Sequence, residues 1–380
     1  MATAKEKFSE IFSISQDTNL AEAGGGHGQK GVDFQRFWAM VRIFELKQEG
    51  AKDFLILFES VQDVAELDSE TIPTKIDIYQ IKKKDGGEWS FNLLTGLLKP
   101  SARKAKVPPT VDVIAKSPIG KLYLAGQACQ HLESAVHFVS NAGCDLPLAT
   151  SGAASKHLSC IAADLDALHT AALEESLALL HSSPGTIPDL KRLSLRKTTL
   201  HPDDPVRLAL GAAVEYLSKN MPSHAGQAKA LVDALFMQLS TLGRQTEPVK
   251  SFAELRLQRG FSMGEMDAAL GALTNVPDLK AYIDTMLDGL THEGLATIRK
   301  LGINVGVTKY FSNLVSGKAF DEERMLIDAC AAMAGEVLLA NPILPALEAK
   351  VTELSLLHKT HKDTEIFAYL LIQVTKHATA

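Results

Sequence analysis

The sequence of 380 residues has few cysteines and no long apolar segment. Its four cysteines are scattered and form no Cys-x-x-Cys pair, which argues against a structural zinc site. No apolar run approaches the roughly 18–20 residues that a membrane-spanning helix needs. The polar amino terminus also lacks the apolar core of a secretory signal. We therefore expect a cytoplasmic protein with reduced thiols and no membrane attachment.

Signatures of several enzyme classes are also missing. Residues 24–31 are rich in glycine, but Lys30 is followed by Gly31, where a nucleotide-binding P-loop has Ser or Thr. We interpret this segment as a flexible lead-in to a helix, with direct phosphate binding as the less favoured alternative. There is no Gly-x-Ser-x-Gly element and no protease helix with two zinc-binding histidines. A net charge of −6 excludes a wholly basic nucleic-acid coat but permits a local basic channel.

The spacing of apolar residues differs between the two parts of the chain. Up to about residue 204, alternating or β-branched runs are interspersed with helical segments, which predicts a mixed sheet flanked by helices. The predicted strands are residues 53–58, 76–82, 136–140 and 190–197, with a polar turn-rich segment at 65–75 and helices at 33–47, 117–132 and 158–180. From about residue 205, helical spacing dominates, with breaks at prolines and glycines. The sequence thus predicts an α/β domain at 1–204, whose first 20 residues form a loose arm, and an all-α domain at 205–380.

Carboxylate and amide side chains gather around the first two predicted strands. Phosphodiester cleavage needs a hard cation, oxygen ligands that hold it, and a positive group or proton donor near the attacking water. Glu59 and Asp63 offer carboxylates after the first strand. Gln80 and Lys82 offer an amide oxygen and a positive charge, and because they are two residues apart they project to the same face of a strand. Asp77 has the opposite parity and is left out of the predicted site, although it stays an alternative to Glu59 as a ligand.

The order of helix, strand with acid, and strand with Gln-x-Lys resembles the restriction-endonuclease-like PD-(D/E)XK superfamily. More narrowly, three segments look like a dsDNA-endonuclease family found as nuclease modules of bacterial anti-phage effectors. These segments are Gly28-Gln-Lys-Gly31-Val-Asp-Phe-Gln35, Phe58-Glu-Ser-Val-Gln-Asp63-Val and Tyr79-Gln-Ile-Lys82. The resemblance is clear over about residues 24–90 and weaker to about residue 210. Some members are fused to cyclic-oligonucleotide sensors and others are encoded beside a HerA-type hexameric ATPase. The C-terminal helices do not look like such a sensor, which favours the ATPase-partnered type.

The resemblance implies roles for five residues. Asp63 is the expected principal metal ligand, and Lys82 is the expected catalytic lysine. Gln80 takes a position usually held by Glu or Asp, Glu59 is a second ligand or a support, and Gln35 contributes from the preceding helix. The implied cofactor is Mg²⁺ or Mn²⁺, and glutamine in place of an acid leaves open whether one metal ion binds or two.

A basic segment follows the second predicted strand, with seven Lys or Arg residues against two acids from Lys82 to Lys106. We expect six of them to bind the backbone of double-stranded DNA, namely Lys83, Lys84, Lys99, Arg103, Lys104 and Lys106. The favoured hypothesis is a metal-dependent DNA endonuclease of anti-phage defence, oligomeric and activated by assembly with a HerA-type ATPase. The alternative is an adaptor with a vestigial nuclease fold that binds partners through its helical C-terminal domain.

Overall fold

A computed structural model describes residues 2–17, 20, 29–100, 110–183, 185–243, 249–275, 279–316 and 321–379. The chain divides into two compact units. The first contains Met1–Ala213 and Val232–Ala269, and the second contains Val214–Leu231 and Leu270–Ala380. None of the helices in the described ranges is long and apolar enough to cross a membrane.

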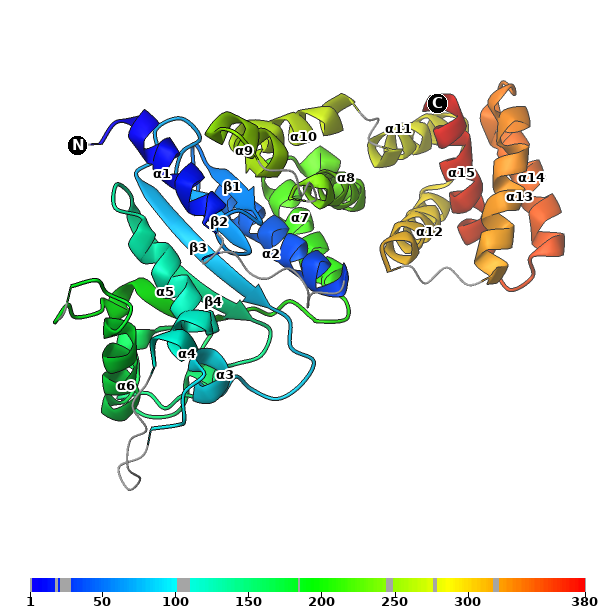
Figure 1. Ribbon diagram of the computed structural model, residues 1–380. Helices are drawn as coiled ribbons and strands as arrows, with labels where there is room; N and C mark the ends of the chain where they lie inside the picture. The colour runs from blue at the N-terminus through cyan, green and yellow to red at the C-terminus, as the bar shows by residue number, and fades with distance from the viewer. Residues whose placement is uncertain are drawn as a thin grey trace. The chain divides into compact units, whose positions relative to one another are not determined.

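The first unit is built on a mixed sheet of seven strands (Figure 1). Along the sheet the strand order is β5-β6-β4-β3-β2-β1-β7. The pairs β3–β4 and β4–β6 are parallel, and the remaining neighbours are antiparallel. The strands span Leu55–Phe58 (β1), Val64–Leu67 (β2), Lys75–Lys82 (β3), Glu133–Ser140 (β4), Ser159–Ile161 (β5), Leu193–Lys197 (β6) and Gly260–Ser262 (β7).

The two faces of the sheet are covered by different helices, as the alternation of side chains requires. Ile76 and Ile78 of β3 belong to one apolar core with Ile11 and Ile14 of α1 (Ala4–Gln16) and with residues of α5 (Pro118–Ala128). On the opposite face, Tyr79 of β3 packs against Trp38 of α2, with 4.7 Å between the ring centroids. Helix α2 spans Gln29–Gln48 and is therefore the cover of the second face near β3.

Several of the other helices of the amino-terminal 275 residues begin at polar caps. Ser90 and Ser117 accept hydrogen bonds from the first-turn amides of α3 and α5, which satisfies donors that a helix leaves unpaired. The other helices of this part of the chain are α3 (Phe91–Thr95), α4 (Val111–Lys116), α6 (Ala167–Ala178), α7 (Val206–Asn220), α8 (Ala228–Thr241), α9 (Phe252–Arg259) and α10 (Met263–Asn275), with short 3-10 helices at Ala154–Lys156, Ala162–Asp164, Leu190–Arg192 and Pro222–Gln227.

The C-terminal helices pack around one central helix, α15 (Asp363–Thr379). Ten consecutive residues of α15, from Ile366 to Thr375, are buried, which is the pattern of a helix enclosed on all sides. Helices α11 to α14 contact it (Figure 1). They span Leu279–His292 (α11), Thr297–Ser316 (α12), Asp321–Leu338 (α13) and Ile343–Leu357 (α14).

The predicted fold class, a mixed sheet flanked by helices followed by a helical region, is confirmed. The predicted boundary at residue 204 differs from the observed division. Strand β7 pairs with β1, so the segment around residue 260 belongs to the sheet unit. Three short strands, β2, β5 and β7, were not predicted. Strand β2 begins one residue before the polar segment predicted at 65–75 and overlaps its start, and β5 lies within a stretch that was predicted to be helical.

Candidate active site

A five-residue turn joins β1 to β2 and carries both predicted carboxylates, Glu59 and Asp63. The amide of Glu59 donates to the carbonyl oxygen of Asp63 at 3.0 Å, which closes the turn. Glu59 and Gln62 have φ angles of 49° and 60°, in the left-handed region that side chains disfavour. Such backbone persists only where surrounding contacts hold it, and it is common at functional sites.

Asp63 continues the pairing of β3 beyond the end of β2. Strand β2 begins at Val64, which pairs with Tyr79, so Ile81 lies past the end of the ladder. The amide of Ile81 donates to Oδ2 of Asp63 at 2.6 Å, and its carbonyl oxygen accepts from Nε2 of Gln35 at 3.3 Å. Two buried side chains thus satisfy backbone groups that would otherwise lack a strand partner.

Gln80 and Lys82 flank Ile81 and complete the cluster at the end of β3. Nζ of Lys82 lies 3.7 Å from Oδ2 of Asp63, and the two side chains are only 12% and 3% exposed. Nε2 of Gln80, which is also buried, donates to Oε1 of Gln62 at 3.4 Å. The structure therefore brings Asp63, Gln80, Lys82 and Gln35 together around the end of one strand.

Glu59 lies on the exposed side of the turn. Its carbonyl oxygen accepts a hydrogen bond from Nη1 of Arg259, and its Cβ and Cγ lie beside Gly243. The Glu59 carboxylate is the most exposed of the five predicted site groups. Its predicted place as a second ligand stays a prediction.

The model of the family described as Cap4, dsDNA endonuclease domain, matches residues 23–243, which is more than half of the chain. The chain belongs to this family. The match includes every residue of the cluster at the end of β3, so the cluster lies inside the Cap4 endonuclease domain. This confirms the resemblance to a PD-(D/E)XK nuclease of anti-phage defence. No curated protein and no solved structure gave a match.

The donors in the Cap4 cluster suit a hard divalent cation. Asp63 offers one carboxylate and Gln80 one amide oxygen, and these are the ligand types that Mg²⁺ accepts while keeping several waters. Within the described ranges, no three His, Cys, Asp or Glu side chains are grouped as a metal site. The residues thus fit a cation held by few protein ligands, and they do not form a cage of carboxylates.

Asp77 belongs to a separate polar network on the opposite face of the sheet. Its Oδ1 lies 2.8 Å from Nε2 of His137, and Nδ1 of His137 lies 2.6 Å from Oγ of Ser194. The Tyr79 ring stacks on His137, and its hydroxyl donates to Glu66 at 3.3 Å. Burial lowers the pKa of His137 and raises the pKa of Tyr79. The sequence did not reveal this network, because residues on the four strands β2, β3, β4 and β6 meet only in the folded sheet.

Three of the six predicted DNA-binding residues of the Cap4 domain can be placed. Lys83 is paired with Asp85, at 2.9 Å, and Nζ of Lys84 donates to the Glu88 carbonyl and lies 4.8 Å from the centre of the Trp89 ring. Lys99 is exposed. The other three, Arg103, Lys104 and Lys106, lie outside the described residues, as does most of the glycine-rich segment at 24–31.

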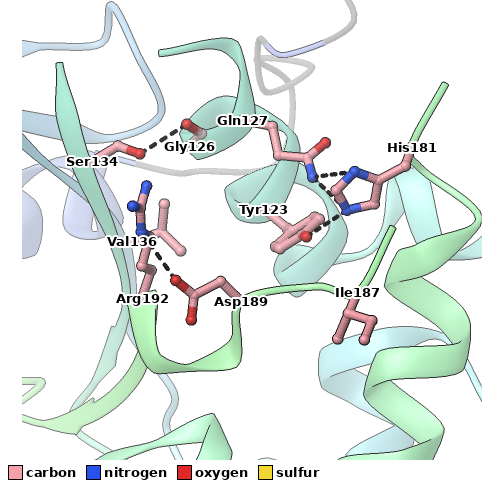
Figure 2. Close-up of a pocket in the computed structure, with 9 residues that line it drawn as sticks. All are labelled: Tyr123, Gly126, Gln127, Ser134, Val136, His181, Ile187, Asp189 and Arg192. Carbon is pink, nitrogen blue, oxygen red and sulfur yellow. Dashed lines mark hydrogen bonds and ion pairs between the residues drawn. The ribbon is translucent and has the colours of Figure 1, made fainter. Parts of the chain in front are cut away.

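A cavity of about 170 Å³ lies at the other end of the sheet (Figure 2). Ser134, which lines it, pairs with Ile76 near the start of β3, whereas the Cap4 cluster lies at the end of β3. Polar side chains around it bond to one another: the Tyr123 hydroxyl lies 2.7 Å from His181, and Arg192 pairs with Asp189 at 3.2 Å. The cavity is therefore distinct from the candidate active site.

Proposed function

We propose that this Cap4-family chain is a Mg²⁺- or Mn²⁺-dependent endonuclease that hydrolyses double-stranded DNA in the cytoplasm during anti-phage defence. The observation that carries the proposal is the nearly buried pair of Asp63 and Lys82, 3.7 Å apart at the end of β3 that extends beyond β2. An acid and a lysine at that place supply two of the three requirements of phosphodiester hydrolysis, an oxygen ligand for a cation and a positive group near the attacking water. The family match independently indicates DNA as the substrate.

Each residue of the cluster has a role that follows from its contacts. Asp63, held by the Ile81 amide, would bind the cation together with the Gln80 amide oxygen, and Glu59 is the candidate for a further ligand. A bound divalent cation supplies the Lewis acidity that this hydrolysis requires. The Lys82 ammonium group is placed to bind a phosphate oxygen or to orient the attacking water. Gln35 fixes the Ile81 carbonyl and so keeps the end of β3 in register.

DNA would be held through its phosphates, with little reading of base sequence. Lys83 and Lys84 follow β3 directly, and Lys99, Arg103, Lys104 and Lys106 lie later in the same basic segment. Contacts of this kind release counterions, so DNA binding should weaken steeply as the salt concentration rises. This salt dependence is measured on plasmid and on short duplexes of unrelated sequence, which should bind alike.

Gln80→Glu should strengthen metal binding, because it adds a second carboxylate beside Asp63. We expect the dissociation constant for Mn²⁺ to fall by roughly tenfold, since affinity for hard cations rises with the charge of the ligands. Without metal, two neighbouring buried carboxylates repel, so the melting temperature should fall and then recover when Mn²⁺ is added. Titration calorimetry and thermal unfolding measure the two effects. Gln127→Glu, at the cavity of Figure 2, is the matched control. Unchanged affinity in Gln80→Glu would remove Gln80 from the ligand set.

We further propose that the helical C-terminal unit mediates assembly, with a second copy of the chain and with a HerA-type hexameric ATPase. A site with few carboxylates fits a nuclease whose active form is completed by assembly. Ile298, Leu301 and Val305 lie at helical spacing on α12, and each is more than half exposed. An apolar stripe of this kind suits a symmetric contact, in which the same surface meets its copy.

Leu301→Glu should weaken self-association, because it places a charge in the middle of this stripe. We expect a lower molar mass by light scattering at micromolar concentration, with the helical content unchanged. Leu356→Glu, at a leucine of α14 that is even more exposed than Leu301, is the control and should leave the mass unchanged. A wild-type chain that is monomeric at every concentration would refute the proposed self-contact.

The absence of a three-ligand carboxylate group in the described residues also favours a second candidate, an adaptor with a vestigial nuclease fold. One experiment separates the two. The chain is copurified with the product of its neighbouring gene, and plasmid degradation is measured with Mg²⁺, with Mn²⁺ and with chelator, for the chain alone and for the complex. Metal-dependent degradation supports the nuclease, and inactivity under every condition supports the adaptor.

A further inference from the structure

The turn that carries Asp63 is contacted by Arg259. This residue lies after residue 243, where the match to the Cap4 family ends. Strand β7 runs antiparallel to β1 with Leu57 opposite Gly260. This register places Arg259, the last residue of α9, beside the end of β1. Nη1 of Arg259 donates to the carbonyl oxygen of Glu59, the first residue of the turn. The pairing of one short strand thus brings a guanidinium group to the turn.

Arg259 is half-buried, and its hydrogen bond to Glu59 lies at the surface of the protein. Its Nε is buried and has no hydrogen-bond partner among the described residues, so the bond to Glu59 accounts for much of what the guanidinium group does. Burial lowers the pKa of Arg259, and the nearby Glu59 carboxylate opposes this effect. A charged donor makes a stronger hydrogen bond to a carbonyl oxygen than a neutral donor does.

Gly243 supports the same turn from the end of α8. A Cβ atom at Gly243 would lie 3.0 Å from Cγ of Glu59, and its φ of 73° also favours glycine. The amide of Gly243 donates to the Gln258 carbonyl at 3.1 Å, which joins this support to α9. Buried Arg36 of α2 donates hydrogen bonds to the carbonyl oxygens of Leu239 and Leu242 and so fixes the end of α8 against α2. The support is therefore anchored on the helix that also carries Gln35.

We propose that Arg259 is a positioning residue of the nuclease centre, which holds residues 59–63 in their strained form and so keeps Asp63 on the Ile81 amide and beside Lys82. The expected effect of Arg259 on cleavage rests on the proposed function, whereas its effect on the conformation of residues 59–63 does not. On this proposal, the segment needed for nuclease activity ends at residue 262, the end of β7, and not at residue 243, where the family match ends. Left-handed backbone at Glu59 and Gln62 relaxes when its supports are removed, and Asp63 lies directly after Gln62.

The test compares Arg259→Ala with Arg256→Ala, because Arg256 lies one turn earlier on α9 and pairs with Glu70, away from the turn. Hydrogen exchange followed by mass spectrometry reports on residues 59–63 and on Ile81 without any need for activity. In Arg259→Ala we expect exchange at both places to be faster by roughly tenfold, as in a local opening. Arg256→Ala should exchange there like the wild type.

The second readout is the concentration of Mn²⁺ that gives half-maximal plasmid cleavage. Arg259→Ala should require about tenfold more Mn²⁺, as expected when a group that orients a ligand is lost, and Arg259→Lys should recover part of the effect. Equal exchange in the two alanine variants would overturn the proposal. If the wild type cleaves under no condition, the proposed function fails, while the exchange experiment still decides the role of Arg259.

Discussion

Asp63→Asn is expected to give a folded protein that does not cleave DNA. Asparagine has the same shape, and its oxygen can still accept the Ile81 amide, so the bond that continues the β3 ladder is kept. What disappears is the negative charge that would hold the cation beside Lys82. Because metal catalysis is worth several kcal/mol, we expect plasmid cleavage to slow by roughly 10³-fold while thermal unfolding changes little. The measurement is the initial rate of nicking of supercoiled plasmid by the active complex.

Asp77→Asn is the matched control for this experiment. Asp77 is also a carboxylate near the sheet centre, but it bonds to His137 on the opposite face. Its variant should cleave within a few-fold of the wild type. If Asp77→Asn were the inactive variant and Asp63→Asn the active one, the assignment of the site to the Lys82 face of β3 would be wrong.

The sequence predicted the strands that have long apolar or alternating runs. Residues 55–58 are buried without interruption, and β3 shows the alternation of a strand with unlike faces, so both could be recognised locally. Strand β2 was missed because its four residues follow an acidic turn and contain Glu66, whose charge is balanced by Arg42 of the distant helix α2. Strand β7 has three residues and exists because β1 offers it an edge. That edge is a property of the folded sheet.

The part of the site that could be predicted is the pair of residues that alternate onto one face of β3. The rest of the site depends on contacts between residues that are distant in the sequence. Spacing along one strand places Gln80 and Lys82 on a common face, and the structure shows both beside the Asp63 turn. Arg259 is 200 residues away from Glu59 in the chain, so no local pattern could have linked them. The Ile81 backbone is likewise invisible to motif analysis, although it fixes both Asp63 and Gln35.

Lys82→Met is expected to abolish cleavage without weakening metal binding. Methionine keeps an apolar chain of similar length, so the nearly buried stem of Lys82 continues to fill its place, and only the ammonium group is lost. A group that orients water or stabilises charge at the phosphate contributes roughly 10²–10⁴-fold to rate, and we expect a loss in this range. The rate is measured on plasmid, and Mn²⁺ affinity is measured separately by calorimetry.

The separation of these two measurements is what distinguishes Lys82 from Asp63. Asp63→Asn should lose both metal affinity and cleavage, whereas Lys82→Met should lose cleavage alone, because an ammonium group repels a cation and does not bind it. Lys75→Met, at the exposed start of the same strand, removes an equal charge far from the cluster and should cleave like the wild type. A Lys82→Met protein as active as Lys75→Met would show that the cluster at the end of β3 is not the catalytic centre, and would favour the adaptor.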